Sequence, residues 1–189
     1  MFIEVLKKIW AFFIDTLQTI LLAFSVFLII YMFLFRPFQV SGLSMFPTFH
    51  DREYILTNLI VLRFEDPKKG DVIVFRAPND PDKEFVKRVI GEPGDTVEIQ
   101  NGRVFINSEQ SDESSYLDEN IRTTGGAFLS EGDVKIVPED SYFVMGDNRP
   151  ASSDSREWGF LKKRAVTGKS FVVYWPVNKF HLVKNPFKS

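Results

Sequence analysis

Residues 96–106 read Thr-Val-Glu-Ile-Gln-Asn-Gly-Arg-Val-Phe-Ile, which is the pattern of a β-hairpin. Asn101-Gly102 separates two short runs rich in β-branched and aromatic residues, Thr96–Gln100 and Arg103–Ile106. A two-residue Asn-Gly connection is a strong hairpin signal because both residues tolerate the positive φ that the tight turn requires. We therefore expect two antiparallel strands here.

Similar runs of Val, Ile, Phe and Tyr recur on both sides of this hairpin, separated by Gly, Pro, Asp and Asn. The further candidate strands are Tyr54–Thr57, Asp71–Arg76, Glu84–Ile90, Val134–Val137, Ser141–Met145 and Ser170–Tyr174. Their close spacing without interleaved helices predicts a mainly β domain built on an antiparallel sheet or barrel. Residues 107–133 are rich in Ser, Asp, Glu and Gly, so we expect a surface excursion or small subdomain there.

The amino-terminal part of the chain has a different character. Residues 16–35 are mostly apolar and carry no charge, and a helix of that length spans about 30 Å, the thickness of the hydrocarbon core of a bilayer. Arg36-Pro37 follows, and proline cannot continue the helix. The sequence predicts a single transmembrane helix over residues 16–35, after a cytoplasmic segment of residues 1–15.

The residues that flank this helix indicate its orientation in the membrane and whether it is cleaved off as a signal peptide. Lys7 and Lys8 precede it and Arg36 follows, so the positive-inside rule favours a cytoplasmic amino terminus and an extracytoplasmic domain over residues 36–189. A cleaved signal peptide would have a shorter apolar region and a small-x-small cleavage site, whereas this run ends in Leu34-Phe35. A buried core helix is the third interpretation.

Composition excludes several classes of function. The net charge of −2 offers no basic surplus for nucleic acid. The chain has no cysteine, which rules out disulfides, a thiolate nucleophile and Cys-ligated zinc. Neither His50 nor His181 stands in a recognisable catalytic motif, and zinc, Walker, dinucleotide and Gly-x-Ser-x-Gly motifs are absent. If the chain is an enzyme, we expect no metal or other cofactor and a base other than histidine.

A lysine in one of the predicted strands could be such a base. Alternation in Glu84–Ile90 places Lys87 between Phe85 and Val89 on one face of the strand. On a core-facing side, desolvation would lower the pKa of this lysine and leave a neutral amine able to accept a proton. The alternative is an edge-strand lysine whose ammonium group stays in water.

Two polar segments have both structural and functional interpretations. Ser44 lies in a turn-rich segment, Ser41–Thr48, close behind the predicted helix, where an ordinary loop serine is the simplest interpretation. Residues 146–156 form a dense polar run after an apolar strand, either a solvated turn or a buried hydrogen-bonding platform of Arg and Asp side chains.

Taken together, these segments resemble the bacterial type I signal peptidases, and most closely the compact Gram-positive type with one anchor. The matching pieces are Ser44-Met45-Phe46-Pro47-Thr48, Gly70–Phe75, Lys87–Asp95, and Gly146-Asp147-Asn148-Arg149 with Ser152, Asp154, Ser155 and Arg156. Their order behind one apolar segment makes the resemblance specific, and it extends from Phe38 to Tyr174. It implies a membrane-bound serine endopeptidase that removes signal peptides from secreted preproteins after Ala-x-Ala, so the expected partners are preproteins and membrane lipid.

The resemblance also implies roles for individual residues. Ser44 would be the nucleophile and Lys87 the general base of a Ser–Lys dyad. Ser152 would orient the lysine. Asp154 and Arg156 would form a supporting salt bridge, with Asp147 and Arg149 as structural partners nearby.

Further implied roles concern the oxyanion and the substrate. The Ser44 N–H would donate to the oxyanion, and Gly42 stands where many Gram-negative members have a serine that donates as well, so the Gly42 N–H or a water would replace that hydroxyl. An extended substrate would lie between Phe38-Gln39-Val40 and the strand Lys83–Lys87, with Val40 and Val86 lining small pockets.

Two rival functions remain open. A self-cleaving LexA-type protease would share the Ser–Lys chemistry, but it would usually carry a DNA-binding domain and no anchor. A catalytically inactive, membrane-tethered β-domain that binds partners would be expected to have lost Ser44 or Lys87, and both are present.

Overall fold

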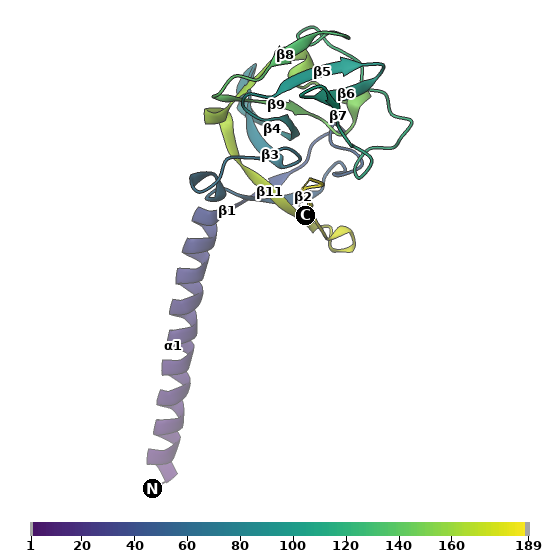
Figure 1. Cartoon of the computed structure of the whole chain (residues 1–189). Helices are drawn as coiled ribbons and strands as arrows, with labels where there is room; N and C mark the ends of the chain where they lie inside the picture. Colours follow the sequence, from purple (N-terminus) through teal and green to yellow (C-terminus); the bar gives the residue numbers. More distant parts are fainter. Residues whose placement is uncertain (1, 188–189) are drawn as a thin grey trace. The chain divides into compact units, whose positions relative to one another are not determined.

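The computed structural model describes residues 2–187. The chain forms two compact units that divide after Phe35. The first unit is a single helix and the second is a β domain, as the ribbon shows (Figure 1).

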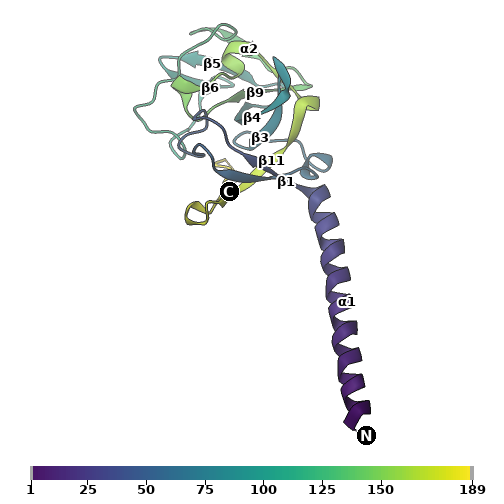
Figure 2. The same ribbon diagram turned by 180° about the vertical axis from the view of Figure 1, so that it is seen from behind.

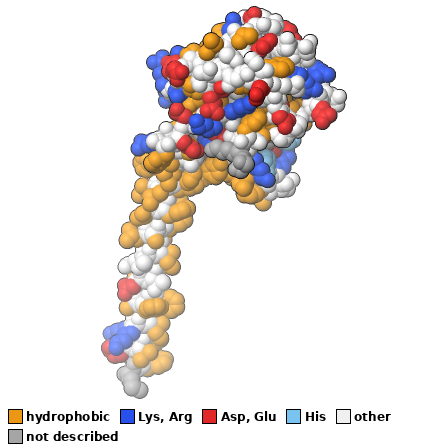
Figure 3. All heavy atoms as spheres, in the orientation of Figure 1, with side chains coloured by type: hydrophobic (Ala, Val, Ile, Leu, Met, Phe, Trp, Pro, Cys, Tyr) orange, Lys and Arg blue, Asp and Glu red, His pale blue; other side chains and the backbone are white. Residues whose placement is uncertain are grey.

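The helix α1 runs over Phe2–Leu34, so it begins well before the predicted span of residues 16–35. Most of its exposed side chains are hydrophobic, and the face seen in Figure 3 shows charged side chains toward its amino-terminal end. Thr16, Thr19 and Ser25 each donate a hydroxyl hydrogen bond to the carbonyl four residues earlier, which satisfies these groups within the helix. By length and composition α1 is long and apolar enough to cross a membrane.

The β domain contains a larger antiparallel sheet. Along the sheet its strands are β1 (Phe35–Gln39), β2 (Tyr54–Asn58), β11 (Val166–Trp175), β3 (Val72–Ala77), β4 (Asp80–Gly91), β9 (Ser141–Met145) and β10 (Leu161–Lys162), and β12 (His181–Leu182) also pairs with β11. Figures 1 and 2 show β3, β4 and β9 side by side in the middle of the domain. This arrangement confirms the predicted mainly β, antiparallel class.

A smaller sheet continues the domain. Its order is β7 (Glu109–Gln110), β6 (Arg103–Ile106), β5 (Thr96–Gln100) and β8 (Val134–Ile136). The hairpin β5–β6 has the predicted bounds, and Asn101 and Gly102 both have positive φ. The remaining elements are a four-residue helix, α2 (Ser155–Trp158), and short 3₁₀ turns at Val61–Arg63, Arg149–Ala151, Lys163–Ala165 and Val177–Lys179.

Apolar side chains pack on both faces of the central strands. One cluster lies between the two sheets and includes Ile90, Val97 and Phe143, while a second includes Val89 and Phe75. Strand β4 is therefore buried on both faces at its carboxyl-terminal end. Any polar side chain at that end is desolvated and needs an internal partner.

Candidate active site

Lys87 lies at the buried end of β4, paired in register with Ile73 on β3. Only 4% of the residue is exposed, so the interpretation as an edge-strand lysine with its ammonium group in water does not hold for this structure. Its Nζ atom lies 2.8 Å from Ser44 Oγ and 3.0 Å from the Val86 carbonyl oxygen. The structure thus brings together the two side chains that the sequence analysis singled out.

Burial lowers the pKa of Lys87 from 10.5 to about 8, although the negative charges of Asp154 and Asp147 act in the opposite direction. Burial dominates because an ammonium group loses its hydration in the protein interior. With such a pKa, roughly a tenth of the molecules carry a neutral amine at pH 7, against fewer than about one in a thousand for an exposed lysine. A neutral amine at this position can accept a hydroxyl proton.

The loop that carries Ser44 is held mainly through its backbone. Asn148 donates its N–H to the Ser44 carbonyl at 3.0 Å and its side-chain amide to the Leu43 carbonyl at 3.0 Å. Met45 is buried directly after the serine. These contacts fix the serine backbone so that its hydroxyl faces Lys87.

Gly42 introduces the turn that leads into this loop. Its φ of +91° lies in the left-handed region that favours glycine. Its N–H, which was expected as a possible second oxyanion donor, donates to Asp51 Oδ1 at 2.8 Å. The Gly42 N–H is therefore engaged in this structure and would have to leave Asp51 in order to reach an oxyanion.

Behind the dyad lies the platform, by which we mean Gly146–Arg156. Asp154 and Arg156 form a bidentate ion pair with two N–O distances of 2.8 Å. Asp154 also accepts a hydrogen bond from the Gly146 N–H. The Asp154–Arg156 ion pair is buried, and through the bond to Gly146 it holds the two ends of the platform together.

Asp147 and Arg149 each have a different partner. Asp147 accepts two hydrogen bonds from Arg88 at 2.8 and 2.7 Å, and a third from Thr48 in the serine loop at 2.6 Å. Arg149 is paired with Glu113. Asp147 and Arg149 are thus held by separate partners, Arg88 and Glu113.

Ser152 is the predicted orienting hydroxyl. Its Oγ atom is buried and has no hydrogen-bond partner within residues 2–187. A Cβ atom added at Gly146 would overlap both this hydroxyl and the Ser44 carbonyl, so the backbone of the platform approaches the serine loop as closely as glycine allows. The expected hydrogen bond from Ser152 to Lys87 is not formed.

A hollow of about 400 Å³ opens beside the dyad. The predicted substrate-binding residues Phe38, Gln39, Val40 and Val86 all line it, together with Ser44 and Lys87. Ile55 and Val74 also line it, and their sequence signal was that of ordinary core residues on strands. Ser41, Ser153, Lys83, Glu84 and Phe85 complete the lining.

Across the described chain, no group of three His, Cys, Asp or Glu side chains is arranged to hold an ion. The chemistry that the site can perform is that of a hydroxyl next to a desolvated amine, which is nucleophilic attack assisted by a general base.

Comparison with known proteins relates the sequence of this chain to one family. The family described as signal peptidase, peptidase S26, matches residues 13–175. Signal peptidase I of Bacillus amyloliquefaciens is 40% identical over 176 residues, covering 90% of this chain and 92% of that protein. Signal peptidase IB of Staphylococcus aureus (strain MRSA252) is 33% identical over 184 residues, covering 92% and 95%. The solved structure of a signal peptidase I from Enterococcus faecalis V583 is 33% identical and covers 56% of this chain and 97% of that one, with a TM-score of 0.47.

Proposed function

The chain belongs to the signal peptidase family, peptidase S26, and as a type I signal peptidase it is a serine peptidase that removes signal peptides; we propose that Ser44 and Lys87 perform the cleavage as a dyad. The observation that carries this proposal is the 2.8 Å separation of Lys87 Nζ and Ser44 Oγ, with the lysine almost fully buried.

In the proposed mechanism, neutral Lys87 takes the proton of the Ser44 hydroxyl while Oγ attacks the scissile carbonyl. Collapse of the tetrahedral intermediate expels the amine of the mature protein, which receives the proton from Lys87, and leaves an acyl-enzyme on Ser44. Lys87 then takes a proton from a water molecule while the hydroxide attacks the ester. When this second intermediate collapses, Lys87 returns the proton to Ser44 Oγ, and the signal peptide leaves with a new carboxyl group, which ionises in water. The lowered pKa of Lys87 supports the two steps in which its amine accepts a proton, from Ser44 and from water.

Ser152, Asp154 and Arg156 support this chemistry in the proposal. The unpartnered Ser152 hydroxyl is free to bond Lys87 once the amine shifts toward substrate. The Asp154–Arg156 pair fixes Gly146, against which Ser152 packs. Asp147 and Arg149 hold the same segment through Arg88 and Glu113.

The oxyanion needs donors besides the Ser44 N–H. The Gly42 N–H can contribute only if it exchanges Asp51 for the substrate oxygen, and a bound water is the other candidate. A single donor of this kind is typically worth about 3–4 kcal/mol of transition-state stabilisation, so a second donor would matter for the rate.

Substrate would bind by strand addition in the hollow between β1 and β4. An extended signal peptide can pair its main chain with Phe38-Gln39-Val40 and with residues 83–87 of β4. Val40 and Val86 line the hollow, and in this proposal they form small pockets that accept the two alanines of Ala-x-Ala. We further propose that α1 anchors the chain with residues 1–15 in the cytoplasm and the β domain outside. Secreted preproteins and membrane lipid would then be its partners, and nucleic acid would not.

The dyad is tested with the full-length chain in detergent and a preprotein whose signal ends in Ala-x-Ala. Mass determination of the fragments should show one cut after that motif for the wild type. Ser44→Ala and Lys87→Ala should leave the preprotein intact while circular dichroism shows a folded chain. Lys87→Arg should also be inactive, because guanidinium stays protonated at neutral pH. Cleavage at the wild-type rate by either alanine variant would refute the dyad, and an intact preprotein with the wild type would favour an inactive β-domain.

A further inference from the structure

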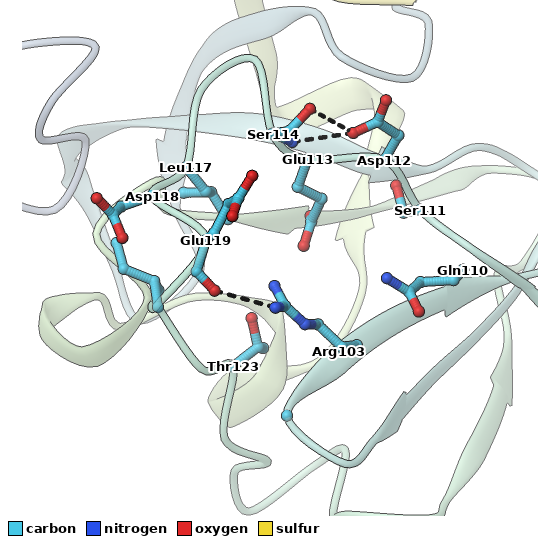
Figure 4. A pocket seen from close by; sticks show the side chains of 12 residues that line it. Arg103, Gln110, Ser111, Asp112, Glu113, Ser114, Leu117, Asp118, Glu119 and Thr123 are labelled. Carbon is cyan, nitrogen blue, oxygen red and sulfur yellow. Dashed lines mark hydrogen bonds between the residues drawn. The ribbon is translucent and has the colours of Figure 1, made fainter.

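Three polar side chains of the excursion of residues 107–133, those of Glu113, Tyr116 and Thr123, contact buried arginines of the domain. Glu113 accepts hydrogen bonds from both Arg149 Nη atoms, one of them at 2.9 Å, and Thr123 accepts one from Arg149 Nη1 at 2.7 Å. Figure 4 shows Glu113 extending from its loop toward the middle of a hollow, while Asp112 and Ser114 bond to each other at the rim. Glu113 is thus the carboxylate of this loop that forms an ion pair with Arg149.

Tyr116 adds a second contact from the same segment. Its ring lies 4.2 Å from the Arg88 guanidinium carbon, and its hydroxyl donates to Glu113 at 2.9 Å. Stacking on an aromatic face stabilises a desolvated guanidinium. The excursion therefore contacts two buried arginines, Arg88 through Tyr116 and Arg149 through Glu113, and these two contacting side chains are hydrogen-bonded to each other.

Both arginines hold the parts that carry the proposed dyad. Arg149 Nε donates to the Gly146 carbonyl at 3.2 Å, and Arg88 binds Asp147 and contacts Thr48 of the serine loop. Between them, Asn148 holds the Ser44 and Leu43 carbonyls. A shift of either arginine would be passed to Ser44 through these hydrogen bonds.

Charge balance makes Glu113 necessary to this arrangement. Three guanidinium groups are buried behind the dyad, those of Arg88, Arg149 and Arg156, and Asp147 and Asp154 neutralise two of them. The third, on Arg149, is neutralised by Glu113 from the excursion. A buried charge without a partner is strongly unfavourable, so Arg149 would turn toward solvent or draw in water if Glu113 were neutral.

We propose that Glu113, oriented by Tyr116, is a positioning residue for catalysis: it fixes Arg149 and, with Tyr116, Arg88, and so keeps the Ser44 loop in register with Lys87. The inference rests on the proposed Ser44–Lys87 dyad. It gives residues 107–133 a function, since the excursion supplies the side chains that complete the platform. The groove for substrate lies on β1 and β4 and includes none of these residues.

The test compares Glu113→Gln and Tyr116→Phe with the wild type, using the full-length chain in detergent and a preprotein ending in Ala-x-Ala. Asp112→Asn is the matched control, because it removes the neighbouring carboxylate, which is exposed and bonds Ser114. Ser44→Ala gives the inactive baseline. Kinetics yield kcat and KM separately, and near-ultraviolet circular dichroism reports whether each variant is folded.

We expect Glu113→Gln to lower kcat on the order of 10- to 100-fold, the effect of moving a reacting group by about 1 Å. KM should stay within about threefold of the wild type because the groove is unchanged. Tyr116→Phe should lower kcat less, about three- to tenfold, since the ion pair remains while its orienting hydrogen bond is lost. Asp112→Asn should match the wild type.

A folded Glu113→Gln variant with wild-type kcat, or with a change confined to KM, would overturn the proposal. If Glu113→Gln does not fold, the kcat of Tyr116→Phe becomes the test. A Tyr116→Phe variant with the kcat of the wild type would then overturn the proposal. This outcome can be told apart from failure of the proposed Ser44–Lys87 dyad. If the dyad proposal were wrong, Ser44→Ala or Lys87→Ala would still cleave the preprotein, whatever the kcat of Glu113→Gln.

Discussion

Replacing Lys87 with methionine should make the protein more stable at neutral pH while it abolishes cleavage. The lysine is almost fully buried on the central strand β4. Methionine has a similar length and carries no charge, so it can occupy the same space without desolvating an amine. The group that we assign to catalysis is therefore expected to destabilise the folded chain.

The size of this effect follows from the change in pKa. The pKa of Lys87 falls from 10.5 to about 8 on folding, and each pKa unit corresponds to about 1.4 kcal/mol, so the penalty is about 3 kcal/mol. Because the folded chain binds fewer protons than the unfolded chain between about pH 8 and pH 10.5, stability rises with pH through that window. The penalty is complete below about pH 8 and disappears above pH 10.5.

The methionine variant also loses the contacts of Lys87 with Ser44 Oγ and the Val86 carbonyl. Each such hydrogen bond contributes about 1 kcal/mol net, so the variant loses about 2 kcal/mol. We therefore expect Lys87→Met to exceed the wild type by about 1 kcal/mol at pH 7, and to fall below it by about 2 kcal/mol at pH 11.

The assay is urea unfolding of the full-length chain in detergent at pH 7 and pH 11, followed by near-ultraviolet circular dichroism. Lys83→Met is the matched control, since Lys83 lies on the same strand but is exposed and pairs with Asp80 at the surface. Its difference from the wild type should not change sign with pH. If the free energy of unfolding of Lys87→Met, relative to the wild type, were the same at both pH values, the argument that burial neutralises Lys87 would be refuted.

Three further predictions concern activity. The rate of cleavage should rise as pH increases through about 8, because Lys87 must be neutral; a flat profile from about pH 5 to about pH 9 would contradict this. Gly146→Ala should abolish cleavage and destabilise the fold by about 1–3 kcal/mol through overpacking, since its Cβ would overlap Ser152 Oγ and the Ser44 carbonyl. Calorimetry measures the loss of stability, and the preprotein fragment assay measures the loss of cleavage. EDTA should leave the rate of the detergent-solubilised enzyme unchanged, because none of the proposed proton transfers uses a metal. A loss of activity restored by added zinc or magnesium would contradict this.

Sequence patterns located most of the fold because strands and hairpins are local features. The hairpin Thr96–Ile106 and the strand Ser141–Met145 have the predicted bounds. Strand β1 was not predicted. Pro37 lies within it, and proline is tolerated at a sheet edge, where β1 lies. The short strands β7, β10 and β12 have two residues each, which is too few for any periodic pattern.

The candidate site was harder to predict because its members meet only in three dimensions. Ser44 and Lys87 lie 43 positions apart, and no spacing rule joins a loop serine to a strand lysine. Their pairing was predicted from the family resemblance, with Lys87 supported by its apolar neighbours. Glu113 was missed for the same reason. It lies 36 positions from Arg149, in a segment whose composition resembles a solvated loop.

Strand β4 has hydrogen-bonded neighbours on both sides, whereas β1 lies at the rim of its sheet. Amide protons near Lys87 should therefore exchange with deuterated water only when the whole domain opens, and those near Phe38 should exchange through local fraying. Mild heat or denaturant would loosen β1 first. In the proposed binding mode this would weaken binding of the preprotein while Lys87 and Ser44 were still hydrogen-bonded. Loss of affinity should thus precede loss of turnover as the enzyme is destabilised.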